Sequence, residues 1–177
     1  MAGTRLVSVI GTKNSGKTTL VVALASNFVR RGNVVSTIKH GSHPATLDVE
    51  GTDTWRHFNE ANVHQTMIES PGQRTLFERV EEESDPVSLV KKYMSGADLV
   101  IVEGFKKYPI PKIEIVRKEN GQQPIFGSEG TRPEDWIALV TDDLTIEAPI
   151  PVIRFDHTSW LMTLSRLAWD NALVIDS

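Results

Sequence analysis

The sequence of 177 residues contains no cysteine. This absence excludes disulfide bonds, thiolate zinc sites, iron–sulfur clusters and cysteine nucleophiles. Long apolar runs are missing too, because the longest, residues 20–25, falls far short of the roughly 20 residues that span a bilayer. Residues 1–5 carry no apolar signal core, so the sequence predicts a cytoplasmic protein with no membrane partner.

Positive charge is also in short supply. Lys and Arg number 19 against 23 Asp and Glu, which gives a formal net charge of −4. Because nucleic-acid binding needs basic surface, this balance argues against a nucleic-acid partner. The apolar content of 40% is typical of a folded protein, and the length predicts one domain over residues 1–177.

The first forty residues have the pattern of a strand–helix–strand unit. Residues 6–10 are mostly apolar and β-branched, which is typical of a strand buried on both faces. Leu20, Leu24 and Phe28 then recur at helical spacing, and residues 34–38 predict a second strand. Units of this length place their strands in parallel, so we expect a parallel sheet here.

A phosphate-binding loop joins the first strand to the helix. Residues 11–18 read Gly-Thr-Lys-Asn-Ser-Gly-Lys-Thr, which is the G-x-x-x-x-G-K-T motif between a strand and a helix. Its two glycines let backbone N–H groups turn inward around a phosphate, and the helix adds its positive N-terminus. The sequence therefore predicts a nucleotide site at this loop.

Particular side chains of the loop have distinct expected roles. Lys17 is a candidate catalytic residue that reaches the β- and γ-phosphates, and the Thr18 hydroxyl is a candidate Mg²⁺ ligand. Lys13 either contacts phosphate, including that of a nucleotide in a facing subunit, or is a solvated loop residue. The predicted nucleotide-binding residues of the loop are Gly11, Thr12, Lys13, Asn14, Ser15, Gly16, Lys17, Thr18 and Thr19.

A second acidic element follows a later strand. Residues 99–102 are apolar, and Glu103 follows at the carboxyl end, where ligands collect in open α/β sheets. An acid at this place in phosphate-loop NTPases holds Mg²⁺ or its water, although it is usually Asp. Glu103 is therefore a candidate metal ligand and catalytic residue, or else a surface acid before a turn. Asp98, at the opposite end, is expected to be an edge or cap residue.

The segment after the second strand carries further polar candidates. Lys39 and His40 are expected at the same sheet edge as the phosphate loop. His40 and His43 make an incomplete metal pattern, because two histidines without a carboxylate or thiol rarely form a site. Asp53 is a candidate second Mg²⁺ ligand from a mobile loop, or else the N-cap of a short helix over residues 54–61.

The later sequence predicts further strands and helices. Asp85-Pro86 begins a helix that stops at Gly96, and residues 159–169 predict an amphipathic C-terminal helix. The expected strands here are residues 64–69, 136–140 and 152–155, and residues 120–135 form an expected loop.

Residues 112–117 alternate between apolar and charged side chains. Ile113 and Ile115 share one face, while Lys112 and Glu114 share the other, which predicts a half-exposed strand. Such a strand invites pairing with a second copy at a sheet edge, so the sequence favours a homodimer. The basic residues between 106 and 118 form either an anion site or a solvated face.

Several motifs occur in one order over residues 5–155. They are the phosphate loop with Thr19-Leu20, Ile38-Lys39-His40, Gly51-Thr52-Asp53-Thr54, DLVIVEGFK over residues 98–106, and Pro111-Lys112-Ile113. Together they resemble the molybdopterin-guanine dinucleotide biosynthesis protein B family. Two features differ from the expected pattern: the Asn-Lys-x-Asp guanine signature is absent, and position 54 is Thr rather than Ser.

The resemblance implies a GTP-binding adapter with weak GTPase activity in molybdenum cofactor biosynthesis, with GTP and Mg²⁺ as cofactors. Its implied partners are the guanylyltransferase that attaches GMP to molybdopterin, molybdopterin or its guanine dinucleotide, and a second copy of the chain. By the same resemblance, Asp53 and Glu103 hold metal or position water, Lys106 contacts phosphate or a partner, and Asp142 reads guanine.

The expected fold is a three-layer α/β phosphate-loop NTPase. Its sheet is mostly parallel, with an antiparallel extension around residues 64–80 and 112–117. Two other functions use the same loop: a small-metabolite kinase with Glu103 as base, and a nickel-insertion GTPase metallochaperone. Turnover with an acceptor distinguishes the kinase, and a tight Ni²⁺ site that depends on His43 distinguishes the metallochaperone.

Overall fold

The computed structural model describes residues 3–41, 48–121, 123–128 and 132–176, which leaves His43 outside the described residues. The chain divides into two compact units, one formed by residues 1–40 and 85–177 and the other by residues 41–84. Within the described ranges, every helix is too short or too polar to cross a membrane.

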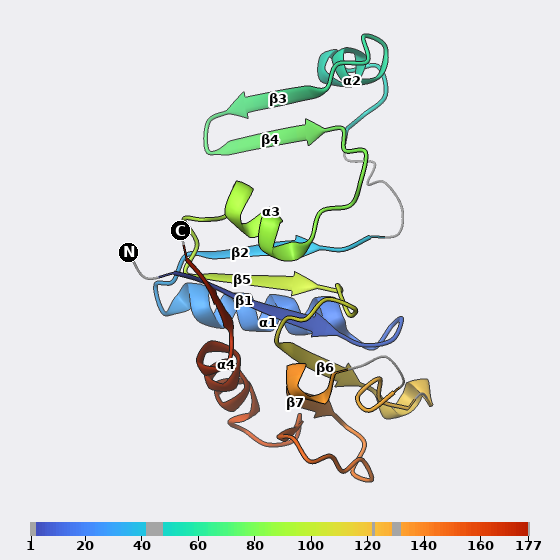
Figure 1. Cartoon of the computed structure of the whole chain (residues 1–177), viewed down its shortest axis with the longest axis vertical. Helices are drawn as coiled ribbons and strands as arrows, with labels where there is room; N and C mark the ends of the chain where they lie inside the picture. Colours follow the sequence, from blue (N-terminus) through green and yellow to red (C-terminus); the bar gives the residue numbers. More distant parts are fainter. Residues whose placement is uncertain (1–2, 42–47, 122, 129–131, 177) are drawn as a thin grey trace. The chain divides into compact units, whose positions relative to one another are not determined.

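A seven-stranded sheet forms the centre of the first unit (Figure 1). The strands are β1 (Thr4–Ile10), β2 (Val35–Lys39), β5 (Leu99–Glu103), β6 (Lys112–Val116), β7 (Trp136–Thr141), β8 (Val152–Arg154) and β9 (Leu173–Ile175). Their order is β2-β5-β1-β6-β7-β8, and these neighbours are all parallel. The short strand β9 pairs antiparallel with the first half of β1.

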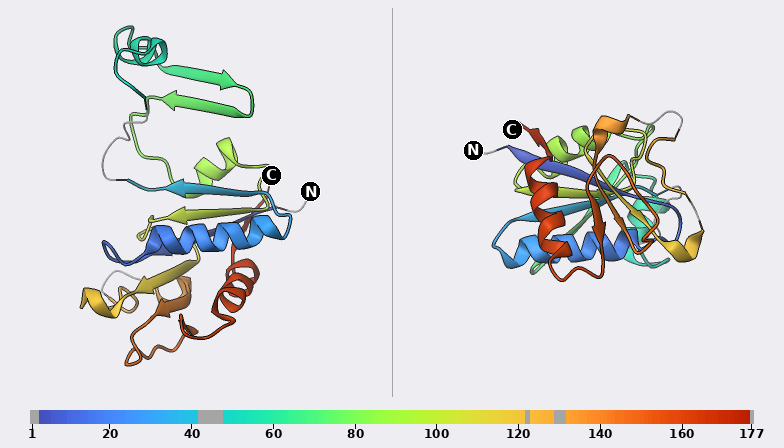
Figure 2. Two further views of the ribbon diagram at one scale, coloured as in Figure 1. Left: turned by 180° about the vertical axis from the view of Figure 1, so that it is seen from behind. Right: turned by 90° about the horizontal axis from the view of Figure 1, so that it is seen from below.

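Three helices cover the two faces of this sheet: α1 (Lys17–Arg30), α3 (Pro86–Tyr93) and α4 (Trp160–Asp170). Figure 2 shows α1 and α4 on one face and α3 on the other. Leu24 and Leu164 pack with Val7 on the first face, whereas Val90 packs with Leu6 on the second. The predicted three-layer, mostly parallel α/β fold is therefore confirmed.

The core lies along β1 and β5 because both strands are apolar on both faces. Leu6, Val7, Val100 and Ile101 are all fully buried. Burying an aliphatic side chain of this size contributes about 1.5–3 kcal/mol. This burial holds the two central strands in place, so their carboxyl ends share one edge of the sheet.

Helix α3 begins where the sequence predicts. The Asp85 carboxylate accepts hydrogen bonds from the backbone N–H groups of Val87 and Ser88, at 2.9 and 3.0 Å. Pro86 occupies the first helical position, where its missing N–H costs no hydrogen bond. This cap fixes the start of α3 at the point where the chain re-enters the first unit.

The second unit holds α2 (Asp53–Asn59) and a two-stranded antiparallel sheet of β3 (Gln65–Ser70) and β4 (Gln73–Glu78). This sheet confirms the antiparallel part expected around residues 64–80. Thr52 caps α2 by accepting the Trp55 N–H at 3.4 Å, so Asp53 is the first helical residue and not the cap. No described residue from 48 to 84 is buried.

Strand β6 differs from its predicted place. It lies between β1 and β7 and pairs in parallel with both, so it is a central strand. The prediction of a half-exposed, antiparallel edge strand is therefore wrong. Lys112 and Glu114 are 1% and 0% exposed. The alternation is present, but loops of the same unit cover the charged face, so edge pairing with a second copy has no basis at this strand.

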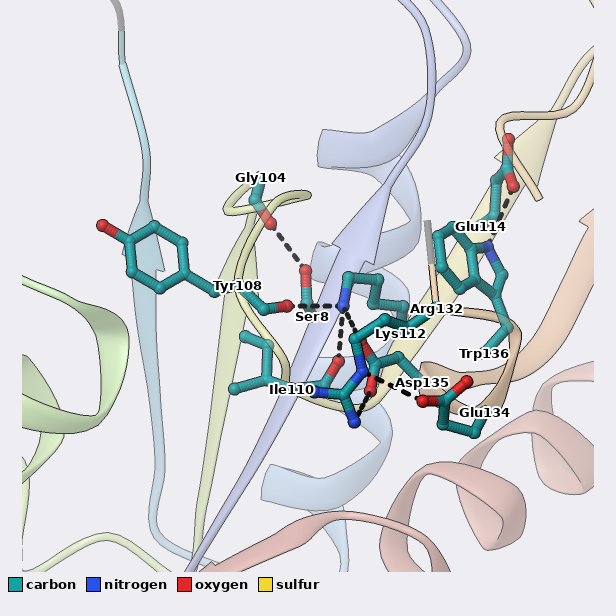
Figure 3. Close-up of polar contacts among 10 residues, drawn as sticks. All are labelled: Ser8, Gly104, Tyr108, Ile110, Lys112, Glu114, Arg132, Glu134, Asp135 and Trp136. Carbon is teal, nitrogen blue, oxygen red and sulfur yellow. Dashed lines mark hydrogen bonds and ion pairs between the residues drawn. The ribbon is translucent and has the colours of Figure 1, made fainter. Parts of the chain in front are cut away.

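Lys112 finds its partners among these loops (Figure 3). Its ammonium donates hydrogen bonds to the carbonyl oxygens of Tyr108 and Ile110, at 2.6 and 2.9 Å, and forms an ion pair with Asp135 at 3.0 Å. Burial lowers the pKa of Lys112, and the bond to Asp135 opposes that change. Satisfied donors and a paired charge are the conditions under which a buried lysine is tolerated.

Candidate nucleotide-binding site

The loop between β1 and α1 has the backbone that its sequence requires. Gly11 and Gly16 take φ values of +152° and +91°, which side chains rarely adopt. A Cβ on Gly11 would lie 2.5 Å from the Ile115 carbonyl oxygen of β6, so only glycine fits there. Helix α1 starts at Lys17, and its first N–H groups have no intrahelical acceptor. The loop and helix end therefore supply the donors of an anion site.

Lys17 extends across this loop. Its ammonium donates a hydrogen bond to the Thr12 carbonyl oxygen at 2.6 Å. Partial burial lowers the pKa of Lys17, the Glu103 carboxylate opposes that effect, and Lys39 adds to it. Lys13 and Asn14 are exposed, whereas Ser15 is buried. Lys17 therefore lies across the phosphate loop and brings its positive charge there.

The two predicted acidic and hydroxyl ligands meet at this edge. The Thr18 hydroxyl donates a hydrogen bond to Glu103 Oε2 at 2.9 Å. Lys39 Nζ lies 3.9 Å from Glu103 Oε1, so β2 adds a cation to the same place. Hydroxyl and carboxylate oxygens are ligands that Mg²⁺ prefers. Thr18 and Glu103 therefore fit a magnesium ion chemically.

The chain turns sharply after Glu103. Gly104 takes φ +105°, and a Cβ there would lie 2.9 Å from the His40 Cβ. The His40 ring lies 4.6 Å from that of Phe105, which itself has a φ of 57°. His40 thus packs on the turn, and Lys106 stands exposed beyond it.

At the other end of β5, Asp98 accepts the Val34 N–H at 2.8 Å, as expected for an edge residue.

A pocket of about 300 Å³ opens beyond the carboxyl ends of β6 and β7. Beside it, Asp142 accepts the Lys118 N–H at 2.8 Å and lies 2.9 Å from Arg117 Nε. Asp142 therefore holds residues that line the pocket. The lining residues are Arg117, Lys118, Gly121, Gln123, Pro124, Asp143, Thr145, Ile146 and Glu147. The family resemblance predicts a guanine contact at Asp142, but the lining residues were not predicted, because they come from two loops without a shared motif.

Two other predicted ligands have local settings of their own. Asp53 belongs to the second unit, where it opens α2. His40 packs on Phe105, and His43 lies outside the described residues. Among the residues that the structure covers, no group of three or more His, Asp or Glu is placed to hold a metal ion.

Comparison with known proteins supports the resemblance seen in the motifs. The profile of the family described as molybdopterin guanine dinucleotide synthesis protein B matches residues 6–142. A molybdopterin-guanine dinucleotide biosynthesis adapter protein of Haemophilus influenzae is 38% identical over 120 residues, which are 64% of this chain and 64% of that relative's length. A probable adapter protein of the same description from Bacillus subtilis is 34% identical over 175 residues, covering 94% and 95%.

A solved structure gives the same answer. The crystal structure of Bacillus subtilis MobB matches with a TM-score of 0.70 and 25% identity, covering 92% of this chain and 97% of that chain. The shared fold and the long family match confirm the resemblance. The chain therefore belongs to the molybdopterin guanine dinucleotide synthesis protein B family.

Proposed function

We propose that the protein is an adapter in molybdopterin guanine dinucleotide biosynthesis that binds GTP with Mg²⁺ and hydrolyses it slowly. The observation that carries the proposal is the meeting of Thr18 with Glu103 beside Lys17. A phosphate loop, a hydroxyl ligand and an acid at one sheet edge are the parts that a nucleoside triphosphate with Mg²⁺ requires.

Each part has a separate proposed task. Loop N–H groups and Lys17 bind the phosphates, and the Thr18 hydroxyl binds Mg²⁺. Glu103 holds the metal or its water, and the longer Glu side chain suits contact through water. When bound, Mg²⁺ supplies charge that offsets the negative phosphate oxygens. Asp53 remains a proposed second Mg²⁺ ligand.

The base is proposed to occupy the pocket beside Asp142. This pocket lies at the same edge of the sheet as the phosphate loop, because β1, β6 and β7 are parallel neighbours. Asp142 then acts on the base directly or through Arg117 and Lys118, which it holds.

The proposed partners are the guanylyltransferase of the pathway and its molybdopterin substrate or guanine dinucleotide product. Lys106 and Lys107 are exposed just beyond the turn after Glu103 and offer positive charge to an anionic partner. The hairpin of the second unit is the proposed dimer contact, because an isolated two-stranded sheet is marginally stable in water and this one has no buried residue.

Nucleotide choice tests the proposal. The purified protein is titrated calorimetrically with GTP and then with ATP, each with Mg²⁺. We expect a GTP preference above about tenfold, or 1.4 kcal/mol. A preference for ATP contradicts the proposal and, with turnover near 1–100 s⁻¹ on an acceptor, would indicate a kinase. A pull-down with the guanylyltransferase then compares the wild type with Lys106→Ala.

A further inference from the structure

Glu114 is a fully buried acid for which the proposed phosphate and metal chemistry has no task. It lies in the middle of β6, with an exposed fraction of 0%. Its carboxylate accepts three hydrogen bonds, from the backbone N–H groups of Ile125 and Phe126 at 2.5 and 2.9 Å, and from the Trp136 indole at 3.0 Å. Figure 3 shows the bond from Trp136. Three donors on one buried carboxylate hold the segments that carry them against β6, so Glu114 anchors those segments to the sheet.

The anchored residues belong to the loop that follows the 3₁₀ turn Lys118–Asn120. Two consecutive backbone N–H groups on one carboxylate fix both the position and the direction of the chain there. The Phe126 ring also packs edge-on against Trp136, with centroids 5.8 Å apart. The loop is therefore attached to the sheet through Glu114 and its aromatic neighbour.

This loop forms one wall of the pocket proposed for the base. Gly121, Gln123 and Pro124 line the pocket, and Pro124 directly precedes the anchored Ile125. The facing wall, which includes Asp143 and Glu147, comes from the chain after β7. The bonds from Ile125 and Phe126 to Glu114 therefore attach the first wall, and not the second, to β6.

We infer that Glu114 is a positioning residue that sets the width of this pocket and thereby the choice between purine bases. The inference rests on the proposed function, because it requires that the pocket takes the base of a nucleotide. Glu114 acts through the loop and does not touch the nucleotide. The side-chain hydrogen bonds of Glu114 go to Ile125, Phe126 and Trp136 and not to the phosphate loop, so we expect its replacement to act mainly on the base.

The test separates the base from the phosphates. Glu114→Gln keeps the side-chain shape but presents an amide N–H₂ toward N–H donors. Dissociation constants are measured by calorimetry for GTP, ATP and inorganic tripolyphosphate, each with Mg²⁺. We expect the GTP-to-ATP preference to fall by about fivefold or more, and tripolyphosphate affinity to change less than about twofold. Glu134→Gln, which alters an exposed acid paired with Arg132, is the matched control and keeps the wild-type preference.

The outcomes are distinct. If wild-type protein binds no GTP or prefers ATP, the proposed function fails and the inference fails with it. If wild-type protein prefers GTP and Glu114→Gln lowers the melting temperature without changing the preference, Glu114 has only a structural role and the inference alone is overturned. Should Glu114→Gln not fold, Pro124→Gly loosens the same wall without altering a buried charge, and an unchanged preference there also overturns the inference.

Discussion

The Thr18 hydroxyl donates a hydrogen bond of 2.9 Å to the Glu103 carboxylate, although 85 residues separate them in the sequence. The contact forms because β1 and β5 are adjacent parallel strands, so the loop after one and the acid at the end of the other reach the same edge. The phosphate loop and the acidic element therefore meet at one edge of the sheet.

Replacing the acid of this pair tests the metal assignment. Glu103→Gln keeps the shape of the side chain and removes its charge, so Mg²⁺ loses an anionic ligand or a partner for its water. We expect the gain in GTP affinity on adding Mg²⁺ to shrink by roughly tenfold, or 1.4 kcal/mol. Titrations in excess Mg²⁺ and in chelator measure it. Asp98→Asn, at the opposite end of β5, serves as control, and an equal gain in Glu103→Gln contradicts the assignment.

Lys112 offers a test of the fold. Lys112→Met removes the donor of two carbonyl oxygens and the closest cation of the Asp135 carboxylate, which keeps only Arg132 at 3.6 Å. Breaking a buried ion pair in this way costs about 3–5 kcal/mol. Chemical denaturation measures the loss, and Lys107→Met, at an exposed position nearby, is expected to change the free energy of unfolding by less than about 0.5 kcal/mol.

If Lys112→Met unfolds at the same denaturant concentration as the wild type, the buried ion pair does not stabilise the fold by the expected amount. The double variant Lys112→Met/Asp135→Asn removes both charges. We expect it to be more stable than Lys112→Met alone, because the mostly buried Asp135 charge is removed together with its closest cation.

The difference between sequence and structure is clearest at β6. Strict alternation of charged and apolar residues is the ordinary mark of a strand with one wet face. It does not reveal whether water or loop donors and acceptors face the charges. Here the carbonyl oxygens of Tyr108 and Ile110 accept hydrogen bonds from Lys112. The backbone N–H groups of Ile125 and Phe126 donate hydrogen bonds to Glu114.

The phosphate loop was predictable for the opposite reason. Gly11 and Gly16 are needed for local backbone geometry, and Asp85-Pro86 for a local cap, so a short stretch of sequence carries the whole signal. Strand β9 and the pocket beside Asp142 depend on contacts between distant segments, and neither has a local pattern.

The cap of α3 gives a pH-dependent stability. Hydrogen bonds from the Ser88 hydroxyl and from backbone N–H groups hold the pKa of Asp85 below its ordinary value of 3.8. Because the folded pKa lies below the unfolded one, the charge-dependent stability is complete above about pH 4 and is lost as pH falls through the folded pKa. We expect Asp85→Ala to cost about 1 kcal/mol at pH 7.

Thermal unfolding of the wild type and Asp85→Ala between pH 7 and pH 2 measures this effect. The difference between the two proteins narrows in acid. A constant difference across the range would mean that the carboxylate charge has no part in the cap.

The hairpin predicts how copies associate. Met67 and Leu76 are cross-strand partners on one face of β3 and β4, and they are 52% and 37% exposed. We expect a dimer that Met67→Glu dissociates, because association would bury the introduced charge. Sedimentation velocity measures the change, with Gln73→Glu as a control on the same hairpin. A wild-type monomer at tens of micromolar contradicts this dimer contact.

Calorimetric titration of the wild type and Lys17→Ala with GTP and Mg²⁺ tests whether the phosphate loop binds a nucleotide. Lys17 lies across the phosphate loop, and its ammonium is the charge proposed to reach the β- and γ-phosphates. We predict a saturable heat for the wild type and affinity at least about a hundredfold lower, or 2.7 kcal/mol, for Lys17→Ala. Equal affinities in the two proteins would contradict a nucleotide site at this loop.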